Sequence, residues 1–143
     1  MTIKDIVDRK GTDVLTIRPS ATVRDVVDRM REKSVAALVV NSGDAIMGIV
    51  SERDVVSSLS RFGEQVLSKT VRDILPRNLV AIAPGDSVKH AMRLMTNHRV
   101  RHLPVVTGGK LVGIVSIGDL VKSRLEDLET ESNVLRDVYI AAR

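Results

Sequence analysis

The feature that most constrains the fold of this chain is an internal repeat. Shifted by 65 residues, positions 19–56 align without a gap on positions 84–121. Upstream, residues 2–6 resemble residues 70–74 at a shift of 68, so the first copy carries three extra residues in its lead-in, within 8–13. A repeat of this length indicates two similar supersecondary units. Each unit alone is too short to bury much apolar surface, so we expect the two to pack against each other.

Each copy shows the same order of patterns: strand, helix, strand, strand, helix. Apolar residues three and four apart indicate the helices, and short apolar runs that end at turn residues indicate the strands. In the first copy we expect strands at 14–17, 35–40 and 46–50, and helices from Thr22 and from Ser51. The equivalent elements of the second copy are strands at 79–82, 100–106 and 110–115, and helices at 87–98 and from Ser116. The residues expected to face the core from the first-copy helices are Val23, Val26, Val27, Met30, Val55, Val56, Leu59 and Phe62.

The last helix is expected to continue well beyond its counterpart in the first copy. Alternating steps of four and three, with Ser132 as the one polar interruption, connect Val121, Leu125, Leu128, Leu135 and Tyr139. This spacing is typical of a helix that packs on a partner helix. Two alternatives stay open: a terminal helix that lies on its own domain, and a break near residues 130–133.

Composition and charge narrow the classes of function. The absence of cysteine excludes disulfides and thiolate metal sites. No apolar run approaches the 18 residues that a membrane span needs, so we expect a cytoplasmic protein. The net charge of +4 invites a nucleic-acid partner, but acids interleave with the basic residues, and Phe62 and Tyr139 are the only aromatic residues available for base stacking. No catalytic, metal-binding or GxxxxGK[ST] motif stands out, which disfavours an enzyme.

Three short motifs carry a family resemblance. They read GIVSERD at 48–54, GIVSIGD at 113–119 and RHLPVV at 101–106. In this order and in tandem they resemble a pair of CBS (cystathionine β-synthase) domains, or Bateman module, of the small free-standing bacterial type. The resemblance implies an α/β (α+β) fold: two β-α-β-β-α repeats about a pseudo-twofold axis, with two clefts. The expected division is a first repeat at 1–65, a second at 66–125 and a C-terminal helical tail at 126–143.

The resemblance also implies a function. Such modules bind adenosine ligands in their clefts, among them AMP, ADP, ATP, S-adenosylmethionine and NAD-type dinucleotides, and they hold no catalytic cofactor. We therefore expect a regulatory sensor that binds an adenine nucleotide, forms a homodimer and signals by a change of shape or association. The alternative is an adaptor for another protein, with an idle nucleotide cleft.

Two carboxylates are the candidate ribose ligands. Asp54 and Asp119 each lie three residues after a serine, Ser51 or Ser116, at the start of a helix. This spacing is that of a helix cap, which needs no ligand. The resemblance adds a second role, because a carboxylate in a cleft accepts hydrogen bonds from both hydroxyls of a ribose.

Basic residues at the start of the strand expected at 100–106 are the candidate phosphate ligands. Arg101 and His102 enter a strand that should be buried, where an unpaired cation is costly. A phosphate would supply the missing partner, with Arg99 and Arg53 as further candidates. The equivalent positions of Arg101 and His102 in the first copy are both alanine, so the two clefts should differ in their phosphate chemistry.

The resemblance places the adenine slot along strand backbones and small side chains. The residues at those positions are Thr16, Ala36, Ala37, Ala81, Ile82 and Pro104.

Overall fold

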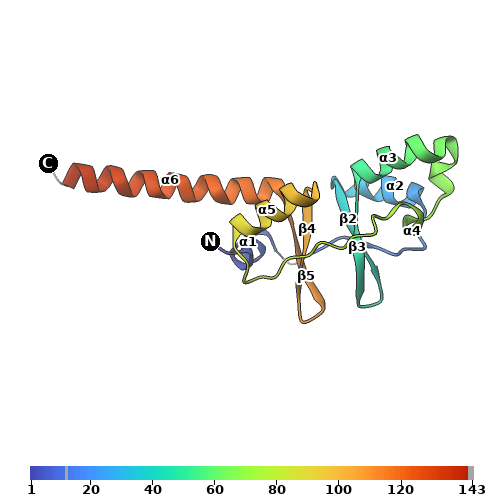
Figure 1. Ribbon diagram of the computed structural model, residues 1–143, viewed down its shortest axis with the longest axis horizontal. Helices are drawn as coiled ribbons and strands as arrows, with labels where there is room; N and C mark the ends of the chain where they lie inside the picture. Colours follow the sequence, from blue (N-terminus) through green and yellow to red (C-terminus); the bar gives the residue numbers. More distant parts are fainter. Residues whose placement is uncertain (12, 142–143) are drawn as a thin grey trace.

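The computed structural model describes residues 1–11 and 13–141. The two repeats lie side by side, and a long terminal helix projects from the second one (Figure 1). The elements of the first half are α1 (Ile3–Lys10), β1 (Thr16–Ile17), α2 (Val23–Lys33), β2 (Ala37–Ser42), β3 (Ala45–Ser51), α3 (Glu52–Phe62) and the 3-10 helix η1 (Gly63–Ser68). Those of the second half are α4 (Val71–Ile74), α5 (Val88–His98), β4 (His102–Thr107), β5 (Lys110–Ser116) and α6 (Ile117–Ala141). This arrangement confirms the predicted fold class.

Each repeat is built on an antiparallel hairpin, β2–β3 or β4–β5, with equivalent register in the two copies. The leading strands are shorter than predicted. Only Thr16 and Ile17 pair with β2, in parallel, and in the second repeat the predicted strand at 79–82 is reduced to one parallel bridge, from Ile82 to Val105. Prolines at 76 and 84 flank this second segment, and proline lacks the amide hydrogen that a longer ladder requires.

The lead-in helices are exchanged between the repeats. Helix α1, which precedes the first repeat, packs into the core of the second through Ile3, Ile6 and Val7. Helix α4, which precedes the second repeat, packs into the core of the first through Val71 and Ile74. Since each core is completed by residues that belong to the other half of the sequence, separation of the repeats would expose apolar surface in both.

Glycine permits the close approach of α1 to the second hairpin. A Cβ added to Gly113 would lie 3.1 Å from both γ carbons of Val7. The equivalent contact in the first repeat is between Gly48 and Leu75, at 3.3 Å. The repeated glycine in the middle of the returning strand, Gly48 or Gly113, therefore serves packing of the lead-in segments.

Three predicted core positions are wrong. Val56 is 67% exposed, Leu59 is 54% exposed and Val27 is at the edge of its apolar stripe, 37% exposed. In α3 the stripe that faces the core is narrow: Ser58 is buried, and Val55 and Phe62 are partly buried against the first core. The periodicity placed these residues on one helical face, but only part of that face meets the core.

Helix α6 runs without a break from Ile117 to Ala141, so the predicted alternative of an interruption near residues 130–133 is wrong. Its first turns pack on α5, α1 and β5. The rest of the helix extends away from the body (Figure 1).

Candidate functional site

A cavity of about 680 Å³ lies between the two repeats. One wall comes from the end of β3 and the start of α3 in the first repeat. The other wall comes from two segments of the second repeat: residues 76–80 and the connection from α5 to β4. The full set of lining residues is Ala36, Ile49, Ser51, Glu52, Arg53, Asp54, Val56, Ser57, Pro76, Asn78, Leu79, Val80, His98, Arg99, Val100, Arg101 and His102.

Asp54 is held at the cavity wall by the cap of helix α3. Its Oδ2 accepts hydrogen bonds from the backbone N–H of Ser51 at 2.7 Å and from the Ser51 hydroxyl at 2.9 Å. These bonds link the N3 carboxylate to the N-cap residue, the serine-to-aspartate pairing that the sequence predicted. Among the described residues the second oxygen, Oδ1, has no hydrogen-bond donor, so the cap leaves one carboxylate oxygen available to the cavity.

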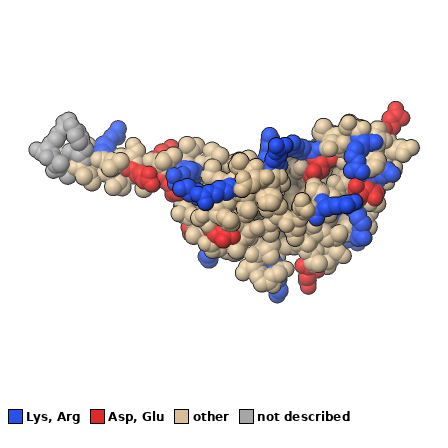
Figure 2. Space-filling view, in the orientation of Figure 1, with Lys and Arg blue, Asp and Glu red and all other residues tan. Residues whose placement is uncertain are grey.

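Three arginines contribute positive charge to this cavity. Arg53 lies in the first turn of α3, while Arg99 and Arg101 lie in the connection that follows α5. Arg53 Nη1 is 3.5 Å from the carbonyl oxygen of Arg99, at the outer limit of a hydrogen bond. Across residues 1–11 and 13–141, none of the three arginines is in an ion pair. Figure 2 shows Lys and Arg side chains gathered at the upper edge where the repeats meet.

The backbone at Arg99 is unusual. Arg99 has φ of 54° and ψ of 41°, in the left-handed region that side chains other than glycine rarely adopt. Ser34, at the equivalent position of the first repeat, has the same conformation. Left-handed residues end helices by turning the chain back, and here the turn carries residues 99–101 to the cavity.

His102 is half-buried at the boundary of the two repeats. Burial lowers its pKa below the ordinary 6.5, and the positive charges of Lys10 and Arg101 lower it further. Asp119 and Glu52 oppose this shift without overcoming it. The imidazole is therefore neutral at pH 7, so it can form hydrogen bonds with a ligand but carries no cation of its own.

Asp119, the equivalent of Asp54, does not line this cavity. Its Oδ2 accepts hydrogen bonds from the backbone N–H of Ser116 at 2.8 Å and from Lys10 Nζ at 2.7 Å. Lys10 Nζ also donates to the carbonyl oxygen of Ile114 at 3.1 Å. Burial tends to raise the pKa of Asp119, but the hydrogen bonds from Lys10 and Ser116 outweigh it, and the pKa is lowered. The second carboxylate thus already has an internal cation.

The origin of this difference lies in the lead-in segments. Aligned at a shift of 68 residues, Lys10 corresponds to Asn78, which lines the cavity, and Asp8 corresponds to Pro76. Helix α4 ends at Ile74, just before Pro76, because proline cannot continue a helix. Helix α1 has no such proline and continues to Lys10, one turn further, which brings the ammonium group to Asp119.

The cavity gathers about half of the residues predicted from the sequence. Those that line it are Ala36, Ser51, Arg53, Asp54, Arg99, Arg101 and His102. Ser116 and Asp119 lie at the equivalent position of the other repeat. Five residues expected in the adenine slot do not line this cavity: Ala37, Ile82 and Pro104 are buried, Thr16 is partly buried and Ala81 is exposed.

Sequence reasoning missed four residues of the second lead-in segment. Pro76, Asn78, Leu79 and Val80 form a wall of the cavity one to five residues before the predicted slot, which begins at Ala81. It also missed Lys10. The signal in the sequence was the proline present in only one of the two lead-ins, which predicts helices of different length.

Among the described residues, no group of His, Asp or Glu forms a metal site, and no described helix has the length and apolar character of a membrane span.

The fold and the cavity define a class of protein: a module of two sequence repeats with a cavity between them. The family model for the CBS domain matches residues 3–61 and 71–126. The chain therefore belongs to the CBS domain family and contains a tandem pair. CBS pairs are generally regulatory modules that often bind adenosine ligands.

Relatives and solved structures agree with this assignment. The chain is 34% identical over 139 residues to the CBS domain-containing protein CBSX3, mitochondrial, of Arabidopsis thaliana, an alignment that covers 91% of this chain and 68% of that protein. A CBS-domain containing protein of Agrobacterium tumefaciens has a TM-score of 0.84 at 34% identity, covering 87% of this chain and 99% of that one. The hexameric CBS-CP12 protein of bloom-forming cyanobacteria has a TM-score of 0.73 at 34% identity, covering 85% and 69%.

Proposed function

We propose that this protein is a regulatory module that binds one adenine nucleotide in the cavity between its repeats and signals by a change of shape or association. AMP, ATP and NAD(H) are the candidate ligands, bound as signals and not converted. The observation that carries the proposal is one cavity in which, among the described residues, a carboxylate oxygen without a donor lies on one side and arginines without an ion pair lie on the other. A nucleotide has the matching pair of groups, a ribose diol and a phosphate.

Each part of the nucleotide has a candidate partner in the proposal. The ribose hydroxyls donate to Asp54 Oδ1 beside the cap made with Ser51. The phosphate accepts charge-assisted hydrogen bonds from Arg53, Arg99 and Arg101, each worth about 1.5–3 kcal/mol where well formed. The base lies on the apolar wall, whose side chains are Ile49, Val56, Leu79 and Val80 beside Ala36.

The proposal assigns one good site to each chain. The equivalent carboxylate, Asp119, lies outside the cavity, and its charge is already paired with Lys10, which donates to Oδ2 at 2.7 Å. The sequence predicted two unequal clefts from the alanines at 36 and 37, and Lys10 adds a second reason for the inequality.

Signalling follows from the position of the cavity. Asp54 and Arg53 belong to the first repeat, while Arg99 and Arg101 belong to the second. A nucleotide that contacts both would favour the arrangement in which they are correctly spaced, by its difference in affinity between two states. Within this proposal the protein is a cytoplasmic homodimer, and the change reaches another protein through it.

The second candidate function is an adaptor that binds another protein while the cavity stays empty. The exposed apolar residues of α6 favour a protein contact. The two functions differ in one measurement, namely nucleotide binding.

Isothermal titration calorimetry with AMP, ADP, ATP, NAD, NADH and S-adenosylmethionine tests the proposal. We expect at least one of them to bind with one ligand per chain. Arg101→Ala should raise the dissociation constant of a phosphorylated ligand by tenfold or more. Arg18→Ala, an exposed arginine outside the cavity, is the control and should bind as the wild type does. No heat from any ligand at millimolar concentration would reject the nucleotide proposal in favour of the adaptor.

A further inference from the structure

Helix α6 carries an apolar stripe that its own chain does not cover. Val121, Leu125, Leu128 and Leu135 are 43%, 54%, 46% and 70% exposed. Together with Ser132 these residues are separated alternately by four and three positions in the sequence, as predicted. The side chain of Tyr139, the last residue in this series, lies outside what the structure describes. We refer to the positions 121, 125, 128, 132, 135 and 139 as the α6 seam.

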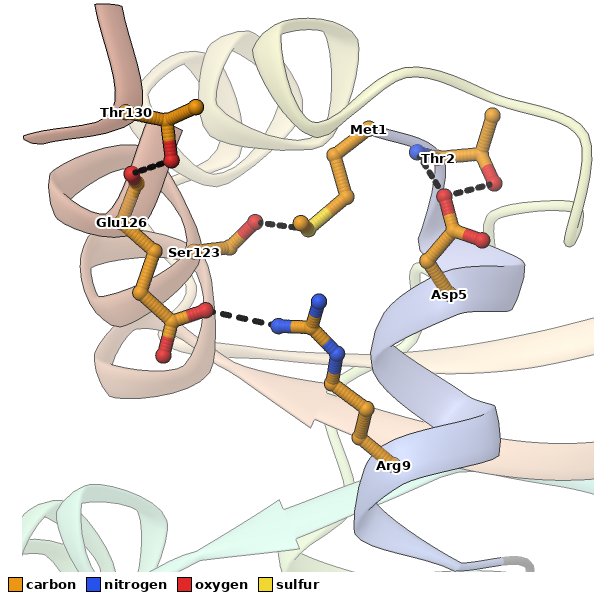
Figure 3. Close-up of polar contacts among 7 residues, drawn as sticks. All are labelled: Met1, Thr2, Asp5, Arg9, Ser123, Glu126 and Thr130. Carbon is orange, nitrogen blue, oxygen red and sulfur yellow. Dashed lines mark hydrogen bonds and ion pairs between the residues drawn. The ribbon is translucent and has the colours of Figure 1, made fainter. Parts of the chain in front are cut away.

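The body of the protein lies on the opposite face of α6. Leu120 and Ser123 are buried, and the Ser123 hydroxyl donates to Met1 Sδ at 2.7 Å. Arg9 Nη1 forms an ion pair with Glu126 Oε2 at 2.6 Å, which fastens α1 to α6 (Figure 3). Beyond this contact the helix stands clear of the body (Figure 2). The alternative of a terminal helix that buries its stripe on its own domain is therefore wrong.

The α6 seam fits the heptad of a coiled coil. Leu125 and Ser132 take a positions, and Val121, Leu128 and Leu135 take d positions. In this frame Leu120, Ser123 and Glu126 fall at positions c, f and b, which face away from a partner helix. The residues that hold α6 to its own body are therefore outside the seam, and both contacts can exist together.

Charges beside the α6 seam select a second copy of the same helix. The g positions are Arg124 and Glu131, and the e positions that follow them five residues later are Glu129 and Arg136. In a parallel, in-register pair each g residue faces the next e residue of the partner helix. Arg124 then meets Glu129, and Glu131 meets Arg136, so each of the four such contacts in a dimer joins opposite charges.

An antiparallel pair would place like charges together. In that orientation e faces e and g faces g. With the apolar layers aligned about the middle of the α6 seam, Glu129 would face Glu129, Glu131 would face Glu131, and Lys122 would face Arg136. Like charges beside the seam are unfavourable, so the sequence of α6 discriminates between the orientations.

We propose that two copies of this protein associate through α6 as a parallel, in-register coiled coil. The bodies lie on the outer faces of the two helices, so a twofold axis along the coiled coil keeps them apart. Ser132 gives one polar layer, which weakens the pair but disfavours registers that would bury it against leucine. This interface specifies the homodimer of the proposed function and does not require a bound nucleotide.

Sedimentation velocity on the full chain tests the interface. We expect a dimer for the wild type at micromolar concentration, and a monomer or at least tenfold weaker dimer for Leu128→Glu. The matched control is Val134→Glu, at an exposed c position of the same helix that is 55% exposed, and it should remain dimeric. An unchanged circular dichroism spectrum shows that each variant is folded. A monomeric wild type, or equal disruption by the control, would overturn the proposal.

Cysteine cross-linking tests the orientation, because the natural chain contains no cysteine. Leu125→Cys and Ser132→Cys, each as a single variant, should both form intermolecular disulfides. The two positions are about 10 Å apart along the helix, so no antiparallel register brings both pairs together. A cross-link at only one position would refute the parallel arrangement. Glu129→Lys should weaken the dimer and the double variant Arg124→Glu, Glu129→Lys should restore it, whereas failure of restoration contradicts the charge pairing.

Neither experiment contains a nucleotide. Absence of a dimer therefore rejects this interface and the homodimer but leaves nucleotide binding in the cavity standing, whereas absence of nucleotide binding rejects the proposed function and leaves the interface standing.

Discussion

Replacement of Asp54 by asparagine separates the charge of this carboxylate from its shape. Asp54 Oδ2 accepts two hydrogen bonds from Ser51, and an asparagine oxygen can accept the same bonds and keep the start of α3. What the variant loses is the negative charge facing the cavity. If a ribose binds there, its two hydroxyls lose a charged acceptor, Oδ1, and meet in its place the amide NH2 group, which can only donate a neutral hydrogen bond.

The expected loss of affinity follows from this exchange. A hydrogen bond to a charged group contributes about 1.5–3 kcal/mol, and one between neutral groups about 0.5–1.5 kcal/mol. The difference over two ribose hydroxyls is about 2–3 kcal/mol. We therefore expect the dissociation constant to rise roughly 30- to 150-fold.

The repeat itself supplies the matched control. Asp119→Asn removes the same charge from the same kind of helix cap, but beside Lys10 and outside the cavity. Calorimetric titration of both variants with the best nucleotide should show the large loss for Asp54→Asn and a change within about twofold for Asp119→Asn. Equal losses, or a loss confined to Asp119→Asn, would refute the assignment of the site.

Other consequences of the structure can be measured separately. Gly113→Ala should crowd Val7 and lower the free energy of unfolding by about 1–3 kcal/mol in chemical denaturation. Gly85→Ala, with open space around it, is the control and should leave that free energy unchanged. Equal stability of the two variants would contradict the packing of α1 on β5. Lys10→Met should lower the free energy of unfolding by at most about 1 kcal/mol at pH 7, since both side chains of its ion pair are partly exposed. The lowered pKa of Asp119 means that this contribution is present above its ordinary pKa of 3.8 and disappears as pH falls below it, so a loss unchanged at pH 2.5 would be evidence against the ion pair. Nucleotide affinity should fall between 50 and 500 mM salt and more steeply for ATP than for AMP, and salt-independent binding would exclude the arginines as phosphate ligands.

Much of the local structure could be predicted from the sequence. The caps at Ser51 and Ser116, the two hairpins and the tandem order depend on turn chemistry and on apolar spacing over a few residues. These are local interactions, and the repeat presents each of them twice. The exposed apolar stripe of α6 could also be predicted, because a heptad pattern depends only on positions along one helix.

The candidate site could be predicted only in part from the sequence. Asp54, Arg99 and Arg101 were predicted and line the cavity, whereas the apolar wall at Leu79 and Val80 was not predicted. Ile82 and Pro104, which were expected in the slot, are buried and do not line this cavity. Which face of a short segment meets a cavity depends on how the two repeats are packed, and no local pattern specifies that.

The sequence by itself determined that two similar units exist, which residues begin and end their helices, and which side chains carry the charge. Only the tertiary structure decided that the lead-in helices cross between the repeats, and that Lys10 reaches Asp119 while Asp54 remains open. The physical reason is the range of the interactions. Caps and apolar periodicity act within a few residues, whereas the contact from Lys10 to Asp119 joins positions 109 residues apart and exists only when α1 docks on the second repeat.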